Sequence, residues 1–330
     1  MSNRNPLDYS INKPLVTSFN PFSYLFKDIT LVSALIAVLV FGLAMLYSSS
    51  GQSFSMVMRQ SIYGFVGLTM MVFISHLKPD SYKNILMHSY WMGLLLLIYV
   101  LFNPAEGYTT SRWIDIGFFQ FQPSEIIRLI LPLSIVAYLH RKESKIRLED
   151  WLYTTLAALI CSYLVFEQPD LGTSIIVFTS GIIPIYLAGL PYRVIAAYVG
   201  MLAIVSPFIW SSLLDYQKQR VLTYFDSNVD PLGDGWNIAQ SQTAIGSGGF
   251  FGKGYLEGTQ SQLNFIPESH SDFILSVIGE EFGLLGITCL FIVYGIIIWR
   301  IFKIGLSAQS PFERLACCSL GFIFLLFILI

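Results

Sequence analysis

Charged residues are scarce in this chain of 330 residues, where Asp, Glu, Lys and Arg make up only 12% of positions while 54% are hydrophobic. One soluble core cannot hide that much apolar surface, so the composition argues against a water-soluble globular protein. The four cysteines and four histidines show no ligand spacing, and neither a disulfide framework nor a metal cluster is predicted from them. A basic stripe typical of nucleic-acid binding is also missing, so we expect no nucleic-acid partner.

Long apolar runs fill the sequence instead. A spanning helix needs roughly 17 to 25 mostly apolar residues. Runs of about this length occur at nine places: 29–47, 60–76, 85–102, 124–139, 151–166, 172–189, 194–212, 273–299 and 313–330. The alternation of a β-barrel is absent, and such runs favour helices whose backbone groups are satisfied within each segment. The sequence therefore predicts an all-α polytopic integral membrane protein.

Lysine and arginine concentrate in alternate loops, which orients the chain in the membrane. The loop "HRKESKIR" between the fourth and fifth runs is the clearest case. With these loops in the cytoplasm, residues 1–28 form a cytoplasmic arm and residues 29–330 form one transmembrane domain. The longest loop, about 213–271, then lies outside between the seventh and eighth spans, and long loops are usually functional.

Two patterns in this outer loop look like ligand sites but lack the expected context. Asp226, Asp230 and Asp234 recur every four residues, yet the prolines and glycines among them favour turn-forming aspartates. The segment "GSGGFFGKG" departs from the phosphate-loop pattern, because Lys253 is followed by Gly254 rather than by Ser or Thr. We expect a flexible glycine turn there, with Lys253 left as a point charge for a lipid diphosphate.

The predicted outer face gathers both signs of charge. Its carboxylates, at outer helix ends, are Glu125, Asp170 and Asp272. Its cations, in outer loops, are Arg112, Arg220 and Lys253. Such a face offers carboxylates for proton transfer and cations for a phosphate-bearing ligand.

Structural explanations exist for the first two acids. Asp170 suits a helix N-cap as well as it suits a ligand. Glu125 and Arg128 are three residues apart on one helical face and are expected to pair while lining the site.

Asp272 has no such ready explanation, because Ser271 can cap the following helix by itself. Glu280 and Glu281 continue the same helix. An uncharged run follows them, and the length of this run as a helix places the pair near the outer surface of the membrane. We expect them to act as positioning groups at the membrane interface.

Four long segments, in order, carry a family likeness: "SRWIDIGFFQFQPSEIIRL", "EQPDLGTSI", "DPLGDGWNIAQSQTAIGSGGFFGKG" and "GTQSQLNFIPESHSDFILSVIGEEFGLLG". They resemble the shape, elongation, division and sporulation (SEDS) family, and "GTQSQL" and "DPLGDGW" resemble its elongation branch more than its division branch. The resemblance implies a peptidoglycan glycosyltransferase of the bacterial inner membrane that polymerises lipid II on the outer face. It also implies a class B penicillin-binding protein and other membrane proteins of the elongation complex as partners.

The family motifs assign roles to individual residues. The aspartate of the PE-x-H-[ST]-DF motif is the family's catalytic residue, and it corresponds here to Asp272. Matching motifs supply substrate-binding candidates: Arg112, Trp113, Glu125, Asp170, Glu268 and His270. Arg128 stands where the family's PSE motif is usually followed by lysine, which keeps the charge but changes the donor geometry. Family members are expected to continue through a tenth span after the ninth run.

These observations lead to one predicted mechanism. Asp272 acts as a general base toward the acceptor sugar hydroxyl, which attacks the anomeric carbon of the donor. Arg112, Arg220 or Lys253, with or without a divalent cation such as Mg²⁺ or Mn²⁺, stabilise the departing diphosphate. No other cofactor is predicted.

Two alternatives stay open. A flippase for the lipid-linked precursor would also use polar groups at membrane depth. The acids cluster on one side, however, and no matched pair of broken helices is predicted. The other alternative is a non-catalytic membrane scaffold of the elongation complex.

Overall fold

Long helices form most of the computed structural model, which describes residues 28–77, 79–103, 112–115, 120–142, 146–226, 229–230, 233–263, 265 and 269–329. The long helices are α2 (Ile29–Ser49), α3 (Phe54–Ser75), α4 (Pro79–Phe102), α5 (Pro123–Arg141), α6 (Leu148–Phe166), α7 (Leu171–Leu187), α8 (Tyr192–Ser212), α12 (Ile274–Ser307) and α13 (Pro311–Leu329). Each apolar run of the sequence overlaps one of them. A two-stranded hairpin, β1 (Ile114–Asp115) with β2 (Gln120–Phe121), precedes α5.

Seven of these helices are long and apolar enough to cross a membrane. The two outside this group are α7, which is apolar but 17 residues long, and α6, which begins with Glu149 and Asp150. The prediction of a helical, multi-pass membrane protein is therefore confirmed, and the count of nine spans stays a prediction.

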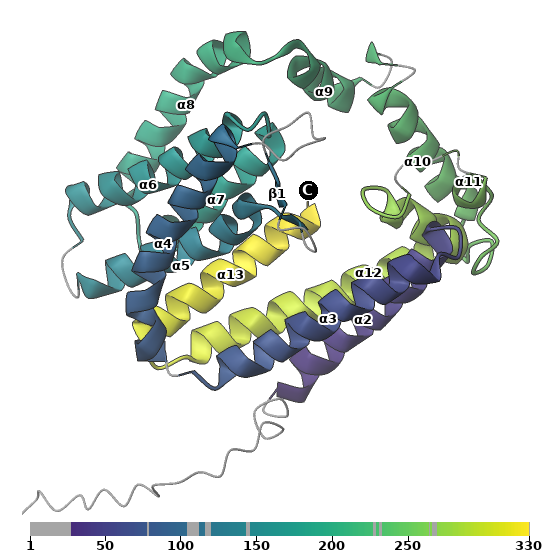
Figure 1. The fold of residues 1–330 in the computed structure, drawn as a ribbon, viewed down its shortest axis with the longest axis horizontal. Coiled ribbons are helices and arrows are strands. Elements are labelled where there is room, and N and C mark those ends of the chain that lie inside the picture. Colours follow the sequence, from purple (N-terminus) through teal and green to yellow (C-terminus); the bar gives the residue numbers. More distant parts are fainter. Residues whose placement is uncertain are drawn as a thin grey trace, which may run out of the picture.

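One group of helices consists of α4, α5, α6 and α7 with α13 packed against it (Figure 1). Its core is a continuous cluster of buried aliphatic side chains that includes Leu97, Leu131 and Val177. At Gly181 the helices approach so closely that an added Cβ would lie 2.6 Å from the Cβ of Ala158. Small residues at such crossings allow the backbone contact that holds helices together in lipid.

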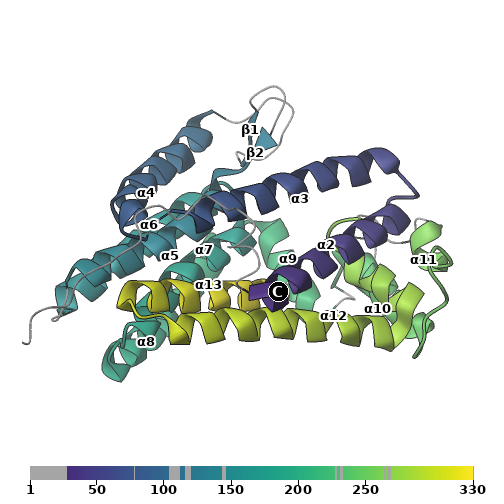
Figure 2. The same cartoon turned by 90° about the horizontal axis from the view of Figure 1, so that it is seen from below.

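The second group joins α2, α3 and α12, and α12 continues into α13, which connects the two groups. Figure 2 shows α12 and α13 side by side. Two helices, α3 and α8, bury none of their residues. Helices that are apolar and exposed on most sides are suited to contact with lipid.

The segment expected as a long outer loop contains three helices: α9 (Asp215–Phe225), α10 (Asp234–Gly248) and α11 (Thr259–Gln262). The connection between α8 and α12 is therefore partly helical, and α10 packs along α12. The turn interpretation holds for Asp226 and Asp230, whose carbonyls accept hydrogen bonds from Val229 and Gly233, whereas Asp234 begins α10. Among the described residues no three His, Cys, Asp or Glu side chains are grouped to hold a metal.

Asp28 ties the start of α2 to the last part of α12. Its carboxylate caps α2 by accepting from the Leu31 N–H at 3.1 Å, and it also accepts from Nε and Nη2 of Arg300. Burial alone would raise the pKa of Asp28, but the hydrogen bonds from Arg300 and Leu31 outweigh burial and hold that pKa below its ordinary value of 3.8.

The Asp28 contact should contribute stability only when the carboxylate is ionised. Because the folded pKa lies below 3.8, the contribution is complete well above that pH and is lost as the pH falls through the folded value. Asp28→Asn should therefore lower thermal stability in detergent at pH 7, by about 0.5 to 1 kcal/mol for a partly exposed pair. The difference should shrink in acid, and a difference that stays constant down to pH 2 would contradict this account.

Candidate functional site

The long helix α12 is broken near the end that carries Asp272. Gly283 has φ 65° and ψ −162°, a backbone conformation that does not belong to a helix. Residues 274–282 and 284–307 are therefore two helical pieces. A break of this kind frees backbone groups that lipid cannot satisfy, so it needs a polar partner within the protein.

The segment 249–254 supplies that partner. The N–H groups of Lys253 and Gly254 donate to the carbonyls of Glu280 and Glu281, each at 3.0 Å. On the other side of the break, the N–H groups at positions 284 and 285 donate to the carbonyls at positions 249 and 250, at 2.9 and 3.1 Å. The glycine-rich segment thus completes the hydrogen bonding of the interrupted helix.

Glycine is required where these two backbones meet. A Cβ at Gly252 would lie 2.1 Å from the Glu281 carbonyl oxygen, and a Cβ at Gly283 would lie 2.4 Å from the Gly252 nitrogen. Gly252 also has φ 81°, in the left-handed region. The expectation of a flexible glycine turn was therefore wrong, because the segment is packed against α12.

Gly283→Ala should destabilise the protein. The backbone conformation of Gly283 is almost closed to other residues, and this strain alone costs about 1 to 3 kcal/mol. Gly295→Ala is the matched control, since Gly295 lies in the same helix with no atom within 4 Å of an added Cβ. Thermal unfolding in detergent should show a large loss for Gly283→Ala and no loss for Gly295→Ala, and equal stabilities would contradict the account.

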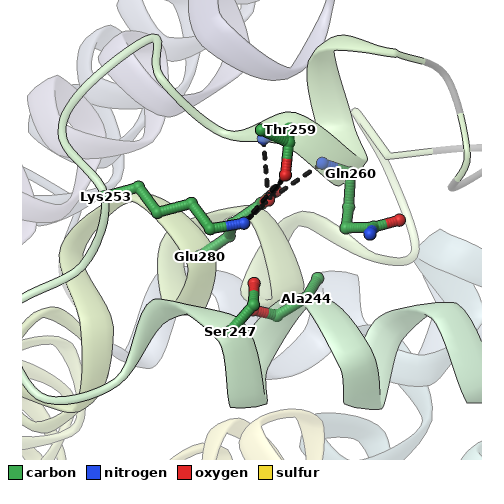
Figure 3. A network of polar contacts seen from close by, with 6 residues as sticks. All are labelled: Ala244, Ser247, Lys253, Thr259, Gln260 and Glu280. Atoms are coloured by element: carbon green, nitrogen blue, oxygen red, sulfur yellow. Dashed lines mark hydrogen bonds and ion pairs between the residues drawn. The ribbon is translucent and has the colours of Figure 1, made fainter.

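Glu280 is the centre of a polar network, and its side chain is 0% exposed. Its Oε1 accepts from Lys253 Nζ at 2.7 Å and from the backbone N–H groups of Thr259 and Gln260 at 2.7 and 2.8 Å. The Thr259 hydroxyl adds a fourth contact at 3.1 Å. Figure 3 shows these donors converging on one carboxylate oxygen. Glu280 therefore fastens the segment 253–260 onto α12.

The network changes two expectations about charge. Lys253 was expected as a loose point charge, but its ammonium is paired with Glu280 and also donates to Thr259 Oγ1 at 2.8 Å. Glu280 and Glu281 were expected as interfacial groups, but their exposures of 0% and 1% place them in the protein interior. Counting along the sequence missed this because it assumed a continuous helix surrounded by lipid.

Glu281 and its neighbours attach the same region to α2. The Ser48 hydroxyl donates to Glu281 Oε1. Two further bonds reach the end of α2, from Tyr255 Oη to the carbonyl at position 44 at 2.9 Å and from Ser269 Oγ to the carbonyl at position 49 at 3.0 Å. The chain on either side of Asp272 is thus anchored on two helices.

Asp272 itself is exposed and lies two residues before α12 begins. It makes no hydrogen bond or ion pair with any residue that the structure describes. Phe273 rather than Ser271 occupies the N-cap position of α12, and it makes no side-chain hydrogen bond there. Anchored backbone and an open carboxylate leave Asp272 available to a substrate.

A second polar group lies at the start of α7. Arg112 Nε donates to the Gln168 carbonyl at 3.2 Å, and Nη2 donates to the Pro169 carbonyl. The same guanidinium forms an ion pair with Asp170 at 3.5 Å. Asp170 also accepts from the Thr173 N–H at 3.1 Å, which confirms the predicted N-cap.

Helix α9 is tied to this group as well. The Tyr216 hydroxyl donates to the Pro169 carbonyl at 3.2 Å, the same oxygen that accepts from Arg112. Arg220 follows Tyr216 by four residues and therefore extends from the same face of α9. Of the two outer-loop arginines predicted as diphosphate contacts, Arg112 lies at the Pro169 carbonyl, and Arg220 lies one turn along α9 from Tyr216, which donates to the same oxygen.

The predicted pair of Glu125 and Arg128 is confirmed as an ion pair at the start of α5. The Arg128 guanidinium lies 4.3 Å from the ring centroid of Phe327, near the end of α13. Glu125 also lies within electrostatic reach of Asp170. These contacts place the start of α5 and the start of α7 at one end of the bundle.

The Glu280 network near Asp272 and the Arg112 group at the start of α7 both lie at this end of the helix bundle. An apolar cavity of about 330 Å³ is lined by α2, α12 and α13, including Ile274 and Phe327. Ile274 is two residues from Asp272, and Phe327 contacts Arg128. Phe327, near the end of α13, therefore lies both at this cavity and against Arg128 of the Glu125–Arg128 pair.

Three remaining candidates are less defined. Trp113 and His270 are partly buried, and His270 lies two residues before Asp272. Glu268 lies outside the described residues. The contacts of Glu280 were the main feature that sequence reasoning missed, and the available signal was a glycine two residues after an acidic residue pair inside an apolar helical run.

Comparison with known proteins identifies the family. The model of the cell cycle protein family that groups FtsW, RodA and SpoVE matches residues 25–330. The chain is 38% identical over 304 residues to the peptidoglycan glycosyltransferase MrdB of Escherichia coli K12, covering 92% of this chain and 82% of MrdB. It is 31% identical over 303 residues to the probable peptidoglycan glycosyltransferase FtsW of Geobacter metallireducens, covering 87% of this chain and 79% of that protein.

Solved structures agree with this assignment. A chain of a peptidoglycan synthase complex that coordinates polymerization and crosslinking matches with a TM-score of 0.75 and 28% identity, over 90% of this chain and 83% of that one. The Thermus thermophilus rod shape determining protein RodA shares the fold, with a TM-score of 0.67 and 24% identity over 93% and 84% of the two chains. The resemblance found in the sequence motifs is confirmed, and the chain belongs to the FtsW, RodA and SpoVE family of cell cycle proteins.

Proposed function

We propose that this chain is a peptidoglycan glycosyltransferase that polymerises lipid II on the outer face of the bacterial inner membrane during cell elongation. The observation that carries the proposal is Asp272, an exposed carboxylate on an anchored backbone, in a chain 38% identical to a peptidoglycan glycosyltransferase. A carboxylate that has no partner among the described residues can take a proton from a bound substrate.

Asp272 would act on the acceptor sugar. Its carboxylate removes the proton from the attacking hydroxyl while the oxygen forms a bond to the anomeric carbon of the donor. The bond from that carbon to the diphosphate breaks at the same time, and the leaving group carries away the electron pair. Arg112 and Arg220 would stabilise the negative charge that develops on the diphosphate. Lys253 has a smaller part than expected, since Glu280 already neutralises it.

The apolar cavity beside Ile274 supports a lipid-linked substrate. It is lined by side chains of α2, α12 and α13 and has a volume of about 330 Å³. Ile274 in its lining is two residues from Asp272. A polyprenyl tail could therefore lie in the cavity while the sugar reaches the carboxylate. A soluble sugar nucleotide has no group that would occupy such a cavity.

Partners follow from the same proposal. A similar chain belongs to a synthase complex that couples polymerization to crosslinking, which supports a class B penicillin-binding protein as the transpeptidase partner. The apolar helices α3 and α8, which bury none of their residues, offer faces for membrane lipid or for a further membrane protein of the elongation complex.

The test is a gel assay for glycan strands. Purified protein, a class B penicillin-binding protein and lipid II should give polymer, with one arm containing Mg²⁺ or Mn²⁺ and another containing a chelator. Polymer in both arms would mean that no divalent cation is needed, and polymer only with the cation would add a metal to the leaving-group step.

The same preparation separates the alternatives. Transfer of lipid II between the leaflets of proteoliposomes, without polymer, would favour a flippase. Neither polymer nor transfer, together with normal rod growth of cells carrying a mutated Asp272, would favour a scaffold.

A further inference from the structure

A second cavity lies at the opposite end of the helix bundle from Asp272. It has a volume of about 770 Å³ and is bounded by the ends of α5 and α7, the start of α6 and the turn from α12 to α13. Its apolar lining includes three buried side chains, Leu139, Trp151 and Phe312. None of its lining residues takes part in the proposed reaction.

Basic side chains border this apolar interior. His140 and Arg314 line the cavity. Lys83 Nζ lies 3.4 Å from His140 Nε2 and 5.0 Å from the ring centroid of Phe312, so a third basic group reaches the same wall. We infer that the cavity binds an anionic phospholipid, with its phosphate near Arg314 and Lys83 and its acyl chains against the apolar lining.

Two acids near this cavity belong to the described residues. The carboxylate of Asp150, at the start of α6, already accepts from Lys142 at 2.9 Å and from the Tyr138 hydroxyl at 2.9 Å. Glu313 precedes Arg314 in the first turn of α13 and is outnumbered by the basic groups. Among the described residues, an anion at the mouth of the cavity would therefore meet more basic than acidic side chains.

The surroundings of the cavity favour a lipid over a soluble anion. Leu306 lines the cavity and is 67% exposed, so an apolar surface continues outward from the mouth. On α12 two turns earlier, Lys303 Nζ lies 4.9 Å and Arg300 5.6 Å from the ring of Trp299. Tryptophan with adjacent cations is typical of the headgroup level of a membrane.

Basic pockets between transmembrane helices are known to hold anionic headgroups. A soluble phosphate would satisfy the cations but leave about 770 Å³ of mostly apolar space without contacts. A zwitterionic lipid would fill that space but would gain little from the cations. An anionic diacyl lipid satisfies both parts of the site.

Trp151 provides a direct readout because it lines the cavity. Nanodiscs of phosphatidylcholine would carry the protein with increasing amounts of brominated phosphatidylglycerol or brominated phosphatidylcholine, and bromine quenches nearby tryptophan. The emission of Trp151 is the difference between the fluorescence of wild type and that of Trp151→Phe. A low mole fraction of brominated phosphatidylglycerol in the nanodisc should already quench this emission. Quenching by brominated phosphatidylcholine should rise only in proportion to the mole fraction of that lipid in the nanodisc.

Charge variants test the site itself. Arg314→Gln and Lys83→Gln should each weaken the preference for phosphatidylglycerol about fivefold. Arg193→Gln is the matched control, since Arg193 is exposed at the same end of the bundle and does not line the cavity. Equal effects of Arg314→Gln and Arg193→Gln would overturn the proposal in favour of general surface attraction.

Two further measurements test whether the site binds a soluble anion and whether the lipid preference can be seen without the Trp151→Phe variant. Millimolar sn-glycerol 3-phosphate should leave the quenching unchanged, and relief of quenching would indicate a site for a soluble anion. Native mass spectrometry of wild type and Arg314→Gln in mixed lipids covers the case in which Trp151→Phe does not fold. Wild type should retain phosphatidylglycerol more than Arg314→Gln does, and equal retention would overturn the proposal.

Discussion

Replacing Asp272 by asparagine should lower the rate of lipid II polymerisation by at least about 100-fold, the smallest loss typical of removing a general base. Asparagine keeps the size and the hydrogen-bonding reach of the side chain but cannot accept the proton. The fold should persist, because Asp272 is exposed and holds no described contact that the fold depends on. Initial rates of glycan formation with saturating lipid II and partner protein measure the effect.

Two variants control for this result. Glu257→Gln removes an exposed carboxylate from the same outer segment and should leave the rate unchanged. Asp272→Glu keeps the carboxylate but displaces it, so it should retain part of the activity that Asp272→Asn loses. A normal rate for Asp272→Asn, with unfolding temperatures equal across the set, would remove Asp272 from the chemical step.

Much of the fold was predictable because the length and polarity of a run along the sequence decide whether it can span a membrane. The thickness of the bilayer fixes the length of an apolar run, and helices must satisfy their own backbone in lipid. Every predicted run accordingly overlaps a helix. Local pairs were predictable for a similar reason, since Glu125 with Arg128 and the cap at Asp170 depend on residues only three apart.

The burial of Glu280 and Glu281 could not be predicted in this way. Their partners come from residues far along the chain, such as Ser48, which is 233 positions from Glu281. The break at Gly283 also brings an outer segment into the bundle and replaces lipid with protein around the pair. Periodicity describes one helix at a time and carries no information about such contacts.

Replacing Glu280 by alanine should destabilise the protein by about 3 to 5 kcal/mol, as expected when one partner of a buried ion pair is removed. The substitution deprives the Thr259 and Gln260 N–H groups of their acceptor and leaves Lys253 unpaired. Thermal unfolding in detergent measures the loss. Glu149→Ala, an exposed acid on α6, is the control and should cost little.

Milder variants separate the charge of Glu280 from its role as an acceptor. Glu280→Gln keeps an oxygen for the two N–H groups and should cost less than Glu280→Ala. Lys253→Met leaves a buried carboxylate without its cation. If the ion pair matters as a pair, the double variant Lys253→Met with Glu280→Gln should be more stable than the sum of the single losses predicts, by about 1 kcal/mol or more. Strictly additive losses would mean that Glu280 acts through the backbone of the segment 253–260 alone, and that the charge of Lys253 is incidental to its position.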